Sequence, residues 1–136
     1  MSHTTAAPAS PPRTRNRAAN IALGVVQVVT ALAILGAGAS TVTGAVQAMA
    51  VFDALGAGDW FRYLTGILEI AGALGLLIPR LVGIAAPALA VLWLVAIGTH
   101  VLVIGGNPAA AVAFFILTAA LTWSRRDRLR DLLPGR

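Results

Sequence analysis

Long apolar segments separated by short polar breaks dominate this sequence and predict helices that span a membrane. About 20 helical residues cross the ~30 Å hydrocarbon core of a bilayer. The apolar residues run continuously, whereas the strands of a membrane barrel alternate in short segments. The expected fold class is therefore all-α, an integral membrane four-helix bundle whose spans are Ala19 to about Ala39, Trp60 to Pro79, Leu81 to Ile104 and Ala109 to Trp123.

Residues at the breaks support these boundaries. Asp59 and Asn107 stand where N-caps belong, and Pro108 stands at a first helical position, where its missing N–H costs nothing. Pro87 predicts a kink in the third span. The fourth span covers only about 22 Å and needs flanking arginines or a thin bilayer. Between the first two spans, residues 40–59 carry little charge and predict a short helix in the outer interface.

The basic residues are all arginine and gather near the two ends of the chain. We expect residues 1–18 to form a disordered basic tail, 19–124 the four-helix transmembrane domain, and 125–136 a basic amphipathic cytoplasmic tail. With four spans, every arginine except Arg62 lies on one side, and that side is cytoplasmic. This predicts a multi-pass protein of the plasma membrane with both termini in the cytoplasm. As an alternative, residues 1–39 resemble a signal peptide with an A-x-A cleavage site, and cleavage would leave three spans.

The composition of the chain excludes several classes of site and partner. The chain is 58% hydrophobic and 11% charged, unlike a water-soluble domain, and the membrane explains its net charge of +5 better than nucleic acid does. It has no cysteine, two histidines, and no zinc-protease, Walker A or dinucleotide-binding motif. We therefore expect no metal site, no nucleic-acid partner and no cofactor that the sequence requires.

One acid, Glu69, lies near the middle of the second span. A charge at the bilayer centre costs about 2.5 to 3.5 kcal/mol on insertion scales, so Glu69 is expected to face the protein interior. Thr65, Gly66, Gly72 and Ala73 lie three or four positions away and share one narrow helical face with it. Such a face lets neighbouring helices approach closely.

A second strip of small residues, Gly36, Ser40, Gly44 and Ala48, recurs every four positions at the end of the first span. It favours close helix contact, within the chain or between protomers, so a homo-oligomer is compatible with the sequence.

Counting 1.5 Å per residue from the cytoplasmic arginines predicts a mid-membrane layer of Gln27, Glu69, Trp93 and Phe114, with Thr30 one turn above Gln27. In this layer Glu69 is either a protonated carboxyl bonded to Gln27 or a backbone carbonyl, or a group that binds a ligand or carries a proton. Trp93 and Phe114 are expected to serve mainly in packing.

His100 is expected about 13 Å above Glu69 along the membrane normal, too far for a direct bond. We therefore assign it to an outer mouth with Asp59, Arg62 and Thr41. There it is either an interfacial histidine bonded to a carbonyl or water, or a ligand or proton-transfer group.

The run from Gly66 to Leu77, G-x-x-E-I-x-G-A-x-G-L-L, followed by Pro79, resembles the second-helix signature of DoxX-like membrane proteins. The resemblance extends over about residues 20–124 and implies a four-helix membrane protein with both ends cytoplasmic. It also implies an association with membrane oxidoreductase complexes, one of them quinone-linked. Thr41 stands where the family often has a lysine, which puts any role of that cation in doubt here.

These observations favour a non-catalytic subunit or scaffold of a membrane redox or envelope complex, with the lipid bilayer and an oxidoreductase or other membrane protein as partners. The alternative is a binder or carrier of a small lipophilic molecule such as a quinone. An enzyme is disfavoured, because no self-contained catalytic constellation is present. A cavity of about 300 Å³ or more beside Glu69 would favour the binder, and a packed layer would favour the scaffold.

Overall fold

The computed structural model describes residues 5–8 and 14–133, and this part of the chain is helical without a strand. The all-α class is confirmed, whereas the specific arrangement as a four-helix bundle stays a prediction. The elements in chain order are α1 (Thr14–Thr43), α2 (Val46–Leu55), α3 (Asp59–Leu77), α4 (Val82–Thr99), the π-helical turn η1 (His100–Ile104), α5 (Ala109–Ser124) and α6 (Arg126–Leu132).

Three of the helical segments described are long and apolar enough to cross a membrane: Arg17–Thr43, Asp59–Leu77 and Val82–Ile104. They correspond to the first three predicted spans, and the chain is a multi-pass membrane protein. The fourth predicted span does form an apolar helix, α5, but its 16 residues fall below that length.

The observed α1 is longer than the predicted first span at both ends. It begins at Thr14, inside the segment expected to be disordered, and continues four residues beyond Ala39 to Thr43. Arginine and alanine are good helix formers, so nothing in the residues before Ala19 ends the helix. At the other end, Gly44 stops it with a φ of 76°, a conformation that glycine adopts without strain.

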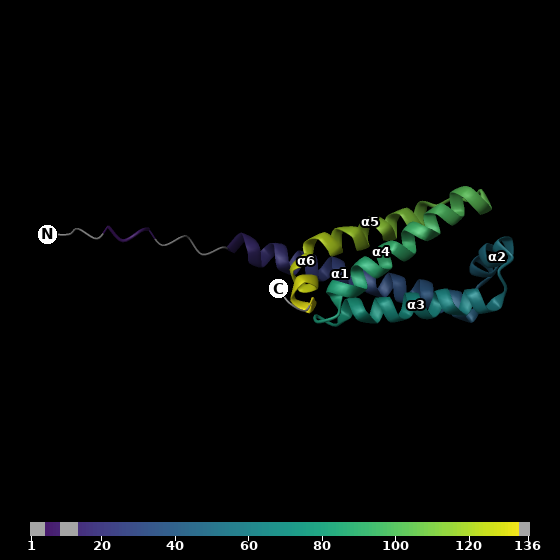
Figure 1. Ribbon diagram of the computed structural model, residues 1–136, viewed down its shortest axis with the longest axis horizontal. Helices are drawn as coiled ribbons and strands as arrows, with labels where there is room; N and C mark the ends of the chain where they lie inside the picture. Colours follow the sequence, from purple (N-terminus) through teal and green to yellow (C-terminus); the bar gives the residue numbers. More distant parts are fainter. Residues whose placement is uncertain (1–4, 9–13, 134–136) are drawn as a thin grey trace.

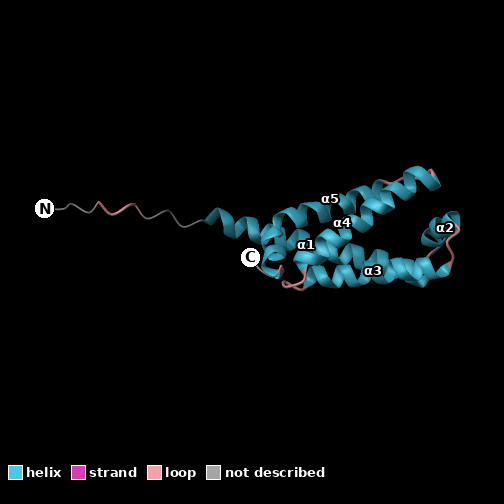
Figure 2. Cartoon of the chain, in the orientation of Figure 1, coloured by secondary structure: helices cyan, strands magenta, loops and turns pink. Residues whose placement is uncertain are grey.

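The long helices form two pairs (Figure 1). In one pair α1 packs along α3, in the other α4 packs along α5, and contacts between α3 and α4 join the pairs. The pairs lie close together near α6 and diverge toward the opposite end, where α2 lies (Figures 1 and 2). There α2 contacts α1, α3 and η1.

Glycines set the closest approaches between helices. A Cβ added at Gly66 would lie 2.5 Å from Val42 Cγ2 and 3.1 Å from the Gly38 carbonyl oxygen, so α1 and α3 nearly touch here. A Cβ at Gly72 would lie 2.5 Å from Leu89, which fixes α3 against α4 in the same way. Both glycines belong to the narrow face inferred for the second span.

The second strip of small residues, at Gly36 and Ser40, does not make a close contact between helices. At Gly36 an added Cβ would meet no atom within 4 Å, and Ser40 is exposed, with its hydroxyl bonded to the Gly36 carbonyl. The close contact on α1 is made at Gly38 instead. The buried core runs along all four long helices and includes Ala31, Ile34, Ala73, Leu76, Ala86, Leu89, Trp93, Ala111 and Leu121.

Candidate binding cleft

A cleft of about 750 Å³ lies between the two diverging helix pairs. Its walls come from α1, α3, α4 and α5, and the end farthest from α6 is lined by apolar side chains of α2 and by His100 of η1. Most of the lining is aliphatic or aromatic. The residues with polar side chains that line it are Thr41, Thr65, Glu69, Trp93, Thr99 and His100.

Glu69 lines this cleft and is only 5% exposed. Thr41 lies beside its carboxyl, but Glu69 Oε2 has no hydrogen-bond partner in the described part of the chain. Trp93, 7% exposed, lines the same cleft, and its Nε1–H also lacks a partner there. A buried polar atom without a partner costs about 1 to 3 kcal/mol, so two of them in one cleft call for an explanation.

Phe114 completes this part of the cleft. Its ring stacks on that of Trp93, with the centroids 4.7 Å apart and the planes inclined by 30°. The stack holds the indole in one orientation, because a rotation of Trp93 would break the contact with Phe114. Glu69, Trp93 and Phe114, three members of the predicted layer, are therefore brought together.

Gln27 and Thr30 do not line the cleft. Gln27 Nε2 donates to the Leu76 carbonyl at 2.5 Å, its Oε1 accepts from Arg125 Nε at 3.2 Å, and Thr30 is buried in the core. On α1, Gly38 lies against the base of the Glu69 side chain, where an added Cβ would lie 3.0 Å from Glu69 Cβ, and Thr41 lies beside the carboxyl.

The expected depth of Gln27 is therefore corrected. The depth count assumed that Arg17 and Arg80 mark the same membrane level. Instead, Gly38 of α1 lies level with Glu69, and Gln27 lies level with Leu76, close to the end of α3. The residues of α1 before Gln27 therefore extend past the end of α3 and beyond Arg80.

The residues assigned to an outer mouth divide between two places. His100 and Thr41 line the same cleft as Glu69, Trp93 and Phe114, so part of the predicted mouth and part of the predicted layer share one cavity. Arg62 is buried at the end of α1, where its Nη1 donates to the carbonyls of Thr41 at 2.6 Å and Val42 at 2.9 Å. The Arg62 Nε lies 3.9 Å from a carboxylate oxygen of the exposed Asp59.

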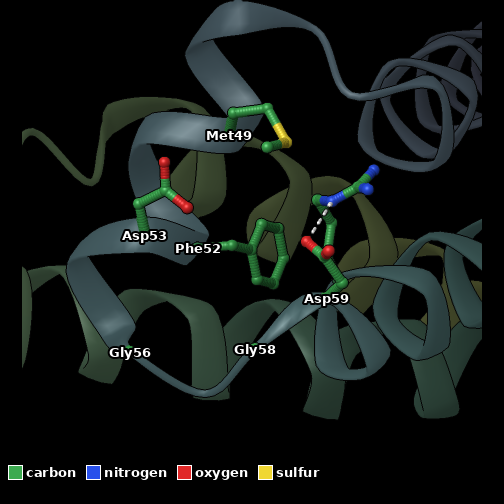
Figure 3. A pocket seen from close by; sticks show the side chains of 7 residues that line it. Met49, Phe52, Asp53, Gly56, Gly58 and Asp59 are labelled. Atoms are coloured by element: carbon green, nitrogen blue, oxygen red, sulfur yellow. Dashed lines mark ion pairs between the residues drawn. The ribbon is translucent and has the colours of Figure 1, made fainter.

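A smaller pocket of about 250 Å³ adjoins Arg62 (Figure 3). Its lining includes Met49, Phe52 and Asp53 from α2, and Asp59 from α3. Phe52 also lines the large cleft, so the two spaces are neighbours. Among the described residues, no three His, Cys, Asp or Glu side chains come together.

Sequence reasoning missed three contributors to this region. They are Thr99, the apolar side chains of α2, and Gly38 as the close contact of α1. Thr99 lies one residue before His100, so the assignment of a functional role to His100 could have drawn attention to it. The covering position of α2 depends on how the chain turns at Gly44 and Gly56, which hydropathy does not reveal.

The model of the DoxX-like family matches residues 25–124. The chain belongs to the DoxX-like family. No curated protein and no solved structure matched it. The matched region of this DoxX-like protein runs from within α1 to the end of α5 and contains every residue that lines the large cleft.

Proposed function

We propose that this DoxX-like protein binds a small lipophilic molecule in the cleft, with the polar head of the molecule beside Glu69 and Trp93. The observation that carries the proposal is the pair of unpartnered polar atoms in a cavity of about 750 Å³. Ligand pockets commonly measure about 300 to 1,000 Å³ and combine an apolar lining with a few polar groups. A bound head group would supply the hydrogen bonds that the protein leaves unmade.

This proposal reverses the order of the two functions expected from the sequence. A scaffold was expected to pack the layer around Glu69 tightly, and a binder was expected to leave space there. The cavity favours the binder. A quinone remains one candidate ligand, and a role as a subunit of a larger redox complex remains compatible with ligand binding.

The proposal includes a placement in the plasma membrane. Four spans, counting α5, would put Arg80 and the arginines that follow α5 at the cytoplasmic edge, where the helix pairs converge. The cleft would then open toward the outer half of the membrane, beneath α2. Large apolar side chains such as Ile67, Leu94 and Ile116 are exposed on the long helices, and their contact with lipid supports a position within the bilayer.

The test is to purify the protein in mild detergent and identify what it carries. Native mass spectrometry should show one small molecule per chain, and mass spectrometry of extracted lipids should identify it. An Ala96→Phe variant places a ring in the cleft lining and should lose the molecule. As a matched control, Ala120→Phe on the exposed side of α5 should retain it.

An empty wild-type protein, or equal loading of the two variants, would overturn the proposal. Stoichiometric recovery of a membrane-protein partner without a small molecule would instead support the scaffold. Thermal unfolding of each variant, followed by circular dichroism, checks that Ala96→Phe remains folded.

A further inference from the structure

The side chains that line the cleft offer more hydrogen-bond acceptors than donors. Three threonines line it, and the hydroxyl of each lies within hydrogen-bond distance of a backbone carbonyl one turn earlier in its own helix, although the Thr41 hydroxyl also bonds the Glu69 carboxyl. The bonds are Thr41 to Ala37 at 3.0 Å, Thr65 to Phe61 at 2.8 Å and Thr99 to Val95 at 2.9 Å. A hydroxyl used in this way keeps its lone pairs, so it can only accept a further hydrogen bond.

His100 has the same bias. Its Nδ1 lies 2.8 Å from the Ala96 carbonyl oxygen, and a carbonyl can only accept, so Nδ1 carries the hydrogen. In the neutral imidazole this leaves Nε2 as an acceptor. Glu69 adds at least one accepting oxygen whether or not its carboxyl is protonated, and the single fixed donor among the cleft-lining side chains described is the Trp93 Nε1–H.

From this inventory we infer that the cleft selects lipophilic molecules whose head donates hydrogen bonds, such as a hydroxyl, over those whose head only accepts them, such as a ketone, an ether or an oxidised quinone. A hydroxyl satisfies both unpartnered atoms, because it donates to an acceptor such as Glu69 and accepts from Trp93. A head that only accepts can take the hydrogen of Trp93, and that of Glu69 when the carboxyl is protonated, but it supplies no hydrogen to the hydroxyl oxygens of Thr65 and Thr99 or to His100 Nε2. Sites built around a substrate hydroxyl reject analogues that lack it, because the buried polar groups are then left unpaired.

This inference rests on the proposed function, and its test compares ligands that differ by one hydrogen-bonding group. The probes are 1-decanol, its methyl ether 1-methoxydecane, and 2-decanone, each added to the full chain in lipid nanodiscs and expressed per lipid. Phenylalanine at Trp60 and Trp123, which are 67% and 73% exposed, leaves Trp93 as the only tryptophan. Fluorescence of Trp93 then reports occupancy of the cleft directly.

We expect half-saturation by 1-decanol at a concentration about tenfold or more below that of the ether and the ketone. A Thr65→Val/Thr99→Val variant should reduce this preference several-fold, because valine keeps the shape and removes the acceptor. Thr118→Val is the matched control. Thr118 is buried and donates to the Phe114 carbonyl at 2.7 Å, but it lies outside the cleft, so the preference should not change.

Equal binding of all three probes would overturn the inference and leave the proposed function standing, whereas saturation by none of them would contradict the proposed function itself. An unchanged preference in the double threonine variant would contradict the assignment of these hydroxyls. Competition between 1-decanol and 1-methoxydecane for the wild-type chain, followed by native mass spectrometry, gives the same comparison without any substitution.

Discussion

Arg62, near the beginning of α3, is buried and donates hydrogen bonds to backbone carbonyls at the end of α1. The last carbonyls of a helix have no partner within it, and a cation there interacts favourably with the helix dipole. Arg62 supplies both, since its Nη1 donates to Thr41 and Val42. The arginine that the positive-inside count treated as an exception is therefore a buried cap.

Replacing Arg62 by methionine should lower the free energy of unfolding by about 2 kcal/mol, because two charge-assisted hydrogen bonds to main-chain carbonyls are lost. Thermal or denaturant unfolding in detergent, followed by circular dichroism, measures the change. Arg130→Met is the control. Among the side chains described, Arg130 pairs with Asp127, at 3.6 Å and in an exposed position, so its loss should change stability by less than about 0.5 kcal/mol. Equal effects of the two substitutions would contradict the capping role.

The burial of Glu69 could be predicted from the sequence, but its unmade hydrogen bond could not. The cost of a charge in hydrocarbon is sufficient to place it inside the protein, where it lies 5% exposed. The missing partner of its Oε2 could not be inferred, because it depends on α1 presenting Gly38 rather than Gln27.

An apolar residue at position 69 should therefore stabilise the ligand-free protein. Glu69→Met removes a buried polar group that has an unmade hydrogen bond, and we expect the free energy of unfolding to rise by about 1 to 3 kcal/mol. Glu69→Gln keeps the polarity and should change it much less. Urea or thermal unfolding of delipidated protein measures both variants. A fall in stability for Glu69→Met would mean that the carboxyl is satisfied in the folded protein.

At the scale of elements, hydropathy located the helices well and their register poorly. Three predicted spans correspond to α1, α3 and α4 with η1, and the segment expected as the fourth corresponds to α5. Register depends on which small residues meet, and the sequence offers several glycines on each helix. Gly38 and Gly66 make the closest contact between α1 and α3, and this choice moves Gln27 away from Glu69.

The contact between Gly38 and Gly66 gives a matched pair of glycine substitutions. Gly66→Ala would place its Cβ 2.5 Å from Val42 Cγ2 and 3.2 Å from Val42 N, so α1 and α3 must separate, and we expect a loss of about 1 to 3 kcal/mol in unfolding free energy. Gly36→Ala meets nothing within 4 Å and should stabilise α1 by up to about 1 kcal/mol. Unfolding of the two variants in the same detergent tests this, and a larger loss for Gly36→Ala would invalidate the observed register.

At the scale of the whole molecule, the two helix pairs diverge toward α2 (Figure 1), and the cleft lies between them. Residues that line it are contributed by all four long helices and by α2. The narrow face of α3 predicts close packing, and at Gly66 and Gly72 the packing is close. The opening beyond this contact depends on the angle between the pairs, so the sequence could suggest Glu69 and Trp93 separately but not the space between them.

The orientation and the number of spans can be tested together because the chain contains no cysteine. A cysteine at Gly106, before α5, should react with a membrane-impermeant maleimide added to intact cells, and one at Ser124, at the end of α5, should react only after permeabilisation. This pattern is expected if α5 crosses the bilayer. The crossing needs a test because α5 is only about 24 Å long at 1.5 Å per residue, so it must thin the bilayer or rely on the arginines that follow it. Ala45→Cys, in the link between α1 and α2, is the outer control. Labelling of both Gly106→Cys and Ser124→Cys from the same side would show that α5 does not span, and would leave three spans with the two termini on opposite sides.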